Sequence, residues 1–349
     1  MTINFSNALI KQLVIHRVGS KLNEEGYFLS KHTNSNIGDD VQPILRDFFT
    51  SSFNQPEFNQ FTHPTAPENN DIFQLSCRFF AYKDQFLEVS NDLAALLYHH
   101  STHPKVKGGE MYVVHLSGVV VDGMNTEALG IYKSENKTPF MKVFHTGDAY
   151  DYTLDEGIDL HTIDKSCIIL NVNESDGYRV CIHDRGARQD EARYWKTDFL
   201  GLKPCADSYN KTKQYMSLCK EFIEQQLPAD FEVAKTDQIE LLNRSVAFFK
   251  SNEKFDYDTF AQEVLPDKMV QESFDRYKND YEQRNELELN DGFDISDGAV
   301  KNRSKFFKSV LKLDKNFHVY VHGNKEFIEQ GFDEDRGLNY YKLFYREEA

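Results

Sequence analysis

EARYWKTDFLGLKPCADSYNKTKQYMSLCK, residues 191–220, separates two different patterns in the chain. Short β-like segments interrupted by turns precede this stretch, and helical periodicity dominates after it. Asp207 or Ser208 can cap a helix here, because a short side-chain oxygen accepts a hydrogen bond from an unpaired N–H of the first turn. We therefore predict two domains, residues 1–190 and residues 191–349.

Two interpretations fit this stretch. It holds the only tryptophan, Trp195, and apolar residues follow at helical spacing, which favours a buried aromatic hinge and an ordinary amphipathic helix. Its excess of basic over acidic residues instead favours a face that contacts an anionic partner. The basic residues are Arg193, Lys196, Lys203, Lys211, Lys213 and Lys220.

The composition indicates a folded chain with a substantial core. Of the 349 residues, 40% are hydrophobic and 13% are aromatic, which argues against intrinsic disorder. The formal net charge of −16 repels membranes and DNA unless basic residues gather locally. We expect no membrane span, no signal peptide and a cytoplasmic location. The five cysteines are widely spaced and odd in number, so we expect buried free thiols.

The region before residue 190 predicts an antiparallel sheet accompanied by helices. Strand-like segments follow one another across turn residues without intervening helices, which is typical of a meander. The strand-like segments are residues 9–18, 26–30, 111–116, 119–121, 128–132, 140–144, 167–172 and 178–182. Helical spacing marks residues 40–53 and 84–100, and the polar residues 54–70 predict a loop. This half therefore indicates an α+β fold.

The region after residue 220 predicts helices followed by closing strands. Helical patterns begin at residue 236 and cover residues 256–265 and 268–289. The closing strands are expected at residues 306–307, 310–311, 317–321 and 340–345, with the last ones pairing across residues 323–337. We expect the aromatic residues of these strands to share an apolar surface with the 191–220 stretch.

Self-association is a further expectation. The predicted helix at residues 268–289 carries large aromatic residues on a charged background, which suits a partly buried interface. Because two-fold dimers are the commonest oligomers, we predict a homodimer formed through this helix.

Charge is uneven in the second half of the chain. Residues 253–298 hold 14 acidic and 5 basic residues, whereas residues 299–323 hold 6 basic residues and 1 acidic residue. Such a pattern is typical of a solvated acidic face, of an acidic arm that folds back on a basic segment, or of two surfaces with different partners. The sequence alone leaves these three alternatives open.

Six segments, in this order and spacing, resemble those of a known protein family. They are ALIKQLVIHRV at 8–18, GIDLH at 157–161, CIILNV at 167–172, RYWKTDFLG at 193–201, FFKSVLKLD at 306–314 and FHVYV at 317–321. The chain resembles the bacterial nucleoid-associated protein family, the NdpA/YejK-like proteins, over almost its whole length. The resemblance implies association with the nucleoid, and with DNA or DNA-handling proteins such as topoisomerases. It supplies no active-site residues.

Catalytic motifs are sparse in the sequence. It contains no GxGxxG, GxxxxGK[ST], GxSxG or HExxH. His99 and His103 stand four residues apart, as two metal ligands on a helix would, although solvated histidines at a helix end explain them as well. Carboxylates such as Asp333, Glu334 and Asp335 could serve a metal-dependent nuclease acting on DNA, which is the alternative function. We expect no enzyme activity, no cofactor and no metal.

The candidate DNA contacts are two basic segments. Most of their residues are lysines, which act as point charges on phosphates and carry no base specificity, so we expect weak, sequence-independent binding. The candidate residues are Arg193, Lys196, Lys203, Lys211 and Lys213, and Lys301, Arg303, Lys305, Lys308 and Lys312.

Overall fold

The chain forms two compact units, Met1–Cys205 and Ala206–Ala349, called here the first and the second unit. A division into compact units does not show which segments fold independently, so the domain boundary after residue 190 stays a prediction. The computed structural model describes residues 1–53, 57–185, 194–265, 267–285, 287–307, 310–321 and 327–347.

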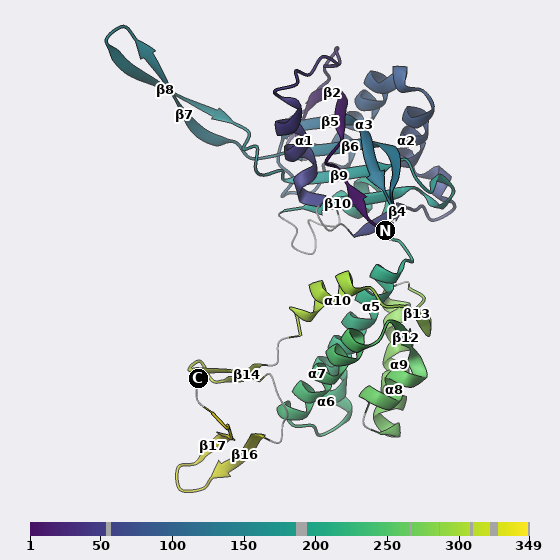
Figure 1. The fold of residues 1–349 in the computed structure, drawn as a ribbon, viewed down its shortest axis with the longest axis vertical. Helices are drawn as coiled ribbons and strands as arrows, with labels where there is room; N and C mark the ends of the chain where they lie inside the picture. Colours follow the sequence, from purple (N-terminus) through teal and green to yellow (C-terminus); the bar gives the residue numbers. More distant parts are fainter. Residues whose placement is uncertain are drawn as a thin grey trace. The chain divides into compact units, whose positions relative to one another are not determined.

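A nine-stranded sheet forms the centre of the first unit (Figure 1). Its strands pair in the order β11-β4-β10-β9-β6-β5-β2-β3, β1 pairs with β5, and every pairing is antiparallel. The α+β class is confirmed. The strands are β1 (Ile3–Asn4), β2 (Leu9–Val18), β3 (Tyr27–Phe28), β4 (Phe58–Phe61), β5 (Gly109–Val121), β6 (Met124–Ser134), β9 (Lys165–Leu170), β10 (Arg179–Asp184) and β11 (Leu202–Pro204).

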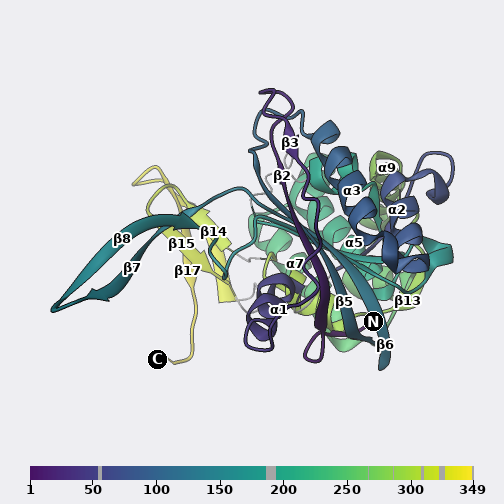
Figure 2. The same ribbon diagram turned by 90° about the horizontal axis from the view of Figure 1, so that it is seen from above.

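Both faces of this sheet are covered. Successive side chains of a strand point to opposite faces, so Cys167 of β9 enters one core and Ile168 enters the other. Helices α2 (Asp71–Ala81) and α3 (Phe86–His100) pack on the Cys167 face, whereas α1 (Gln42–Thr50) packs on the Ile168 face (Figure 2). The sheet is therefore the middle layer of three.

The first half of the 191–220 stretch completes this unit. Tyr194–Phe199 form a π-helical turn, η5, and β11 follows it at the sheet edge beside β4. Trp195 is fully buried in the core shared with α2 and α3, and its Nε1–H donates to the carbonyl oxygen of Ser166 at 3.3 Å. The expected burial of the tryptophan is confirmed.

Several elements of the first unit were missed by the sequence pattern, among them β4 and α2. The predicted loop at residues 54–70 contains β4, which pairs with both β10 and β11. Its four residues, FNQF, are too few to show alternation among their polar neighbours. Helix α2 was missed as well; its start is set by Asn70, whose side chain accepts from the backbone N–H of Phe73 at 2.9 Å.

A long hairpin leaves the sheet between β6 and β9 (Figure 1). It consists of β7 (Thr138–Thr146), which was predicted in part, and β8 (Ala149–Gly157), which was not. β8 contains Asp151, Asp155 and Glu156, residue types that are depleted in strands, and these hide its strand character in the sequence.

The second unit is built mainly from helices. A single aromatic-rich core joins them, with Phe248, Phe255 and Phe260 within 6.0 Å of one another by ring centroid. The elements are α5 (Ser208–Glu221), η6 (Phe222–Gln226), α6 (Leu227–Asp230), α7 (Lys235–Ser251), β12 (Lys254–Asp256), α8 (Tyr257–Val264), α9 (Lys268–Asn285), β13 (Gly292–Asp294) and α10 (Asp297–Ser304).

The interface predicted for residues 268–289 is wrong. Phe274, Tyr277 and Tyr281 of α9 are buried in the core of the second unit. Their spacing places them on one stripe of the helix, and that stripe packs inward while the charged residues face solvent. The homodimer itself stays a prediction, but α9 does not offer these aromatic residues to a partner.

The closing strands form two separate hairpins. β14 (Val310–Leu313) pairs with β15 (Phe317–Tyr320), and β16 (Ile328–Asp333) pairs with β17 (Leu338–Leu343). The predicted pairing across residues 323–337 is therefore wrong, because short turns bring each strand back on its sequence neighbour.

The aromatic residues near the C-terminus do not share one apolar surface with the 191–220 stretch. The predicted strand at residues 306–307 is wrong, because these residues follow α10 outside any strand. Phe307 packs against the helical core, whereas Phe306, Phe317 and Phe344 are exposed. The β14–β15 hairpin instead packs against α7, through a small cluster of Ile239, Leu311 and Val321.

Candidate nucleic-acid interface

Helices α5 and α10 bring the C-terminal part of the first basic segment, residues 208–220, next to the second segment within the second unit. The side-chain amide of Asn302 donates to the hydroxyl of Tyr209 at 3.0 Å, across a sequence separation of 93 residues. Near the start of α10, the backbone N–H of Ser296 donates to the hydroxyl of Thr212 at 3.0 Å. Residues far apart in the sequence therefore lie on adjacent helices.

Each of the two helices has a capped N-terminus. Asp207 accepts from the backbone N–H of Asn210 at 2.8 Å, and Ser296 accepts from the backbone N–H of Ala299 at 3.4 Å. The cap predicted at Asp207 or Ser208 is thus provided by Asp207. These caps fix where each helix begins, and so fix the register in which their lysines are presented.

Lysines of both segments reach the surface of this unit. Lys301, Lys305 and Lys312 are exposed, and Lys211 is half-buried on α5. Within the described part of the chain, none of these four takes part in a salt bridge. They are referred to here as the lysine set. Because their charges are not neutralised by a neighbour, they can act on an external anion.

Arg303 serves the fold rather than the surface. Its Nη2 donates to the hydroxyl of Ser217 on α5 at 2.5 Å, and its guanidinium lies 5.6 Å from the centre of the Phe306 ring. A guanidinium held in this way joins α10 to α5. The sequence predicts the same DNA-contacting role for Arg303 as for Lys301 and Lys305, whereas in the structure Arg303 makes contacts within the fold and the two lysines are exposed.

The remaining candidates lie elsewhere or outside the described residues. Lys203 is exposed on β11, and Lys196 is half-buried in η5 with a contact of its own, so both belong to the first unit. Lys213 is half-buried on α5 and also has a contact. Arg193 and Lys308 lie outside the residues that the structure describes.

Most acidic residues of 253–298 lie on other elements than the lysine set. Of those that the structure describes, all but Asp297 fall on β12, α8, α9, β13 and the segments that flank these elements. The lysine set lies on α5, on α10 with its C-cap residue Lys305, and on β14. In the view of Figure 1, α9 and α10 flank α5 on opposite sides. This distribution is compatible both with a solvated acidic face and with two surfaces that have different partners, so these alternatives stay predictions.

A polar pocket of about 200 Å³ lies at one end of the sheet in the first unit. Two lysines and two carboxylates meet beside it: Lys133 is 3.2 Å from Glu135, and Lys165 is 2.9 Å from Asp184. Burial lowers the pKa of Lys133, and the carboxylate of Glu135 opposes that shift. Lys133 also donates to the carbonyl oxygen of Lys107 at 2.6 Å. These charges satisfy one another, which is the pattern of a structural network.

Groups that could hold a metal ion do not assemble among the described residues. The Nδ1 atoms of His99 and His103 contact the Lys21 amine at 3.2 Å and the Lys105 backbone N–H at 3.3 Å. Asp333 accepts from the backbone N–H of Arg336 at 3.0 Å in the turn between β16 and β17. Among the described residues, therefore, no cluster of metal ligands supports the nuclease alternative.

The groups that hold the site together were not visible in the sequence. Tyr209, Ser217 and Asn302 set the packing of α5 against α10, and each is a common residue in a common context. No spacing signal links residues that far apart, because their contact depends on tertiary packing.

One comparison with known proteins identifies a family. The family model described as nucleoid-associated protein YejK matches residues 14–337, which is nearly the whole chain. No curated protein matches the chain. No helix among the described residues is both long and apolar enough to cross a membrane.

Proposed function

Because the chain belongs to the nucleoid-associated protein YejK family, we propose that it acts at the bacterial nucleoid without catalysis, by contacting DNA through a local basic surface. The observation that carries the proposal is the packing of α5 against α10, which gathers lysines of two sequence segments in one unit. A protein of net charge −16 needs such a gathering to approach a polyanion.

The contact is directed at phosphates. Lys301 and Lys305 stand four residues apart at the C-terminal end of α10, so they project from nearly the same side of the helix. Lysine ammonium groups neutralise phosphates as point charges and do not distinguish bases. Binding is therefore weak, independent of sequence and sensitive to salt.

An equilibrium titration of labelled DNA duplexes tests this proposal. The triple variant Lys301→Gln, Lys305→Gln and Lys312→Gln lowers affinity for every duplex sequence by a similar factor. Arg303 is left in place, because replacing it would disturb the fold. The matched control replaces Lys250, Lys254 and Lys268, which are exposed and lie outside the basic segments, by Gln, and it has the same net charge as the triple variant.

Equal affinities for the triple variant and its control would mean that the lysine set is not the DNA site. A wild-type protein that binds no duplex at low salt would instead favour a protein-mediated link to the nucleoid, through a DNA-handling partner such as a topoisomerase. Incubation of the pure protein with supercoiled plasmid and Mg²⁺ or Mn²⁺ distinguishes the nuclease alternative. The proposal expects the plasmid to stay supercoiled.

A further inference from the structure

The β7–β8 hairpin is an arm without a partner in the first unit. Its strands are paired along their full length, from Thr138 opposite Gly157 to Thr146 opposite Ala149. At about 3.4 Å per residue, nine residues give an arm of roughly 30 Å. Among the described residues, both of its edges are unpaired and its side chains join none of the hydrophobic cores. An isolated two-stranded hairpin is only marginally stable in water.

One face of the arm is free of carboxylates and lysines beyond the Pro139–Glu156 pair at its base and carries mostly apolar side chains. The cross-strand pairs on this face are Met141 with Leu154, Val143 with Tyr152, and His145 with Tyr150. The His145 and Tyr150 rings meet edge to face, with centroids 5.3 Å apart. We call this the arm face. Its large hydrophobic side chains are Met141 (58% exposed), Val143 (59%), Tyr150 (78%), Tyr152 (59%) and Leu154 (69%).

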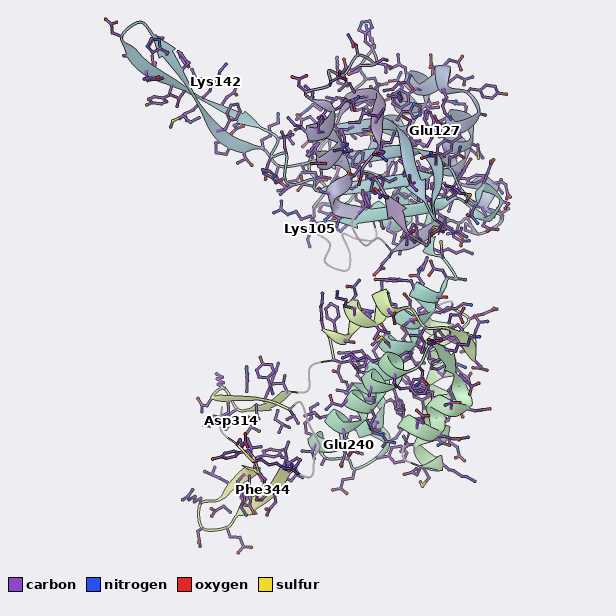
Figure 3. All side chains as sticks on the ribbon, viewed as in Figure 1. Lys105, Glu127, Lys142, Glu240, Asp314 and Phe344 are labelled. Carbon is purple, nitrogen blue, oxygen red and sulfur yellow. The ribbon has the colours of Figure 1, made fainter. Side chains whose placement is uncertain are left out.

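Charge excludes nucleic acid as the occupant of this face. The arm carries one basic residue, Lys142 (Figure 3), against four acidic ones. Asp151 and Asp155 pair with Phe144 and Phe140 on the opposite face, so they leave the arm face free of charge over its outer part. The net negative charge of the hairpin would repel the phosphates of a nucleic acid, whereas an apolar protein surface can pack against the apolar arm face.

We propose that the arm face is the contact between two copies of this chain, packed face to face about a two-fold axis. Such an interface is self-complementary, since each residue meets its own patch on the partner. Two chains of net charge −16 repel each other least where acidic residues are absent, and the acidic residues of the arm lie in its turn, on its opposite face or at its base. This inference does not depend on the DNA contact proposed above.

The size of the arm face is compatible with such a dimer. An aromatic side chain buries about 150–250 Å² when fully enclosed, so the two tyrosines at these exposures offer roughly 270 Å² per arm, and with the three aliphatic side chains the arm offers roughly 500 Å². Two arms together bury about 1,000 Å², the size at which specific protein contacts begin. Tyrosine is also enriched in interface centres, where its ring packs and its hydroxyl reaches the wet rim.

Light scattering on the full chain tests the dimer and its location. The wild type at micromolar concentration has twice the monomer mass of 40.6 kDa. Tyr152→Glu raises the dimer dissociation constant by at least about 100-fold, because a central aromatic is replaced by a charge on both copies. The control Thr153→Glu adds the same charge on the opposite face of the same strand and leaves the dimer intact. Both variants keep the wild-type circular dichroism spectrum, because the arm joins neither core.

Engineered cysteines test the packing of face against face. The native thiols are buried or half-buried, so background cross-linking is low. Under mild oxidation Val143→Cys forms a covalent dimer, whereas Thr153→Cys does not. A wild-type monomer, an equal loss of dimer in both glutamate variants, or cross-linking only through residue 153 would each overturn the proposal. A dimer that Tyr152→Glu breaks and Val143→Cys fails to cross-link would overturn the two-fold arm-on-arm packing.

Discussion

The guanidinium of Arg303 on α10 donates a hydrogen bond to the hydroxyl of Ser217 on α5, at 2.5 Å and across 86 residues of sequence. This bond joins the two helices that carry most of the lysine set. It also divides the basic residues of α10 into one that holds the helix in place and two, Lys301 and Lys305, that remain at the surface.

Replacing Arg303 by Ala should destabilise the second unit by about 1.5–3 kcal/mol, the usual contribution of a hydrogen bond to a charged group. Replacing its exposed neighbour Lys301 by Ala should change the free energy of unfolding by less than about 0.5 kcal/mol. Urea denaturation of both variants makes the comparison. Equal stabilities would show that the Arg303 contact does not hold α10.

His16 should make the stability of the first unit depend on pH. The Ser30 N–H donates to Nδ1 of His16 at 3.1 Å, so Nε2 carries the proton and donates to the hydroxyl of Ser90 at 3.1 Å. Burial lowers the pKa of His16 to about 4. In the unfolded chain His16 has its ordinary pKa of about 6.5, so it is protonated below that pH, whereas in the folded chain it stays neutral until about pH 4. The free energy of unfolding therefore falls as the pH drops from about 6.5 toward 4.

The expected loss from this one group is about 3 kcal/mol between neutral pH and pH 4. It is measured as the difference in unfolding free energy between the wild type and His16→Gln, which removes the titrating group. The difference in unfolding free energy should decrease by about 3 kcal/mol between neutral pH and pH 4. The contributions of the other titrating groups are the same in both proteins and cancel in this difference. A difference that is constant with pH would contradict the neutral state of His16.

The Lys133–Glu135 pair should show strong coupling. Lys133→Met leaves the largely buried carboxylate of Glu135 and the carbonyl oxygen of Lys107 without their partner, at a cost of about 3–5 kcal/mol. Adding Glu135→Gln should recover part of that loss, because the unpaired charge is removed. A double-mutant cycle by chemical denaturation measures the coupling, and strictly additive losses would rule it out.

Trp195 offers a test of the domain boundary. Since it is the only tryptophan and lies in the core of the first unit, its fluorescence reports on that unit alone. A fragment of residues 1–205 should fold with the emission of a buried indole. A fragment of residues 1–190 lacks Trp195 and β11, and it should be much less stable by circular dichroism. Equal stability of the two fragments would place the boundary where the sequence pattern put it.

The fold was predictable where local pattern and tertiary packing agree. The apolar alternation of residues 9–18 matches β2 residue for residue, and the spacing of Asp84 to His100 matches α3 within two residues. It was not predictable where an element is short or polar. β4 has four residues among polar neighbours, and α10 has two buried residues, Ala299 and Val300.

The residue types of the candidate DNA site could be predicted from the sequence, but the positions of these residues relative to one another could not. A local excess of lysine is visible in the sequence, whereas the roles of Arg303, Asn302 and Tyr209 depend on which helices meet. The aromatic residues of α9 illustrate the converse error, because a stripe on a charged helix looks the same whether it faces a partner or its own core.

The salt dependence of DNA binding tests the central claim most directly. For duplex DNA, each neutralised phosphate contributes about −0.9 to the slope of log Kobs against log salt concentration. The triple variant at Lys301, Lys305 and Lys312 should flatten that slope by roughly one unit for each lost phosphate contact. The control at Lys250, Lys254 and Lys268 should keep the wild-type slope. A slope unchanged in the triple variant, or equally flattened in the control, would contradict DNA contact through the α5–α10 surface.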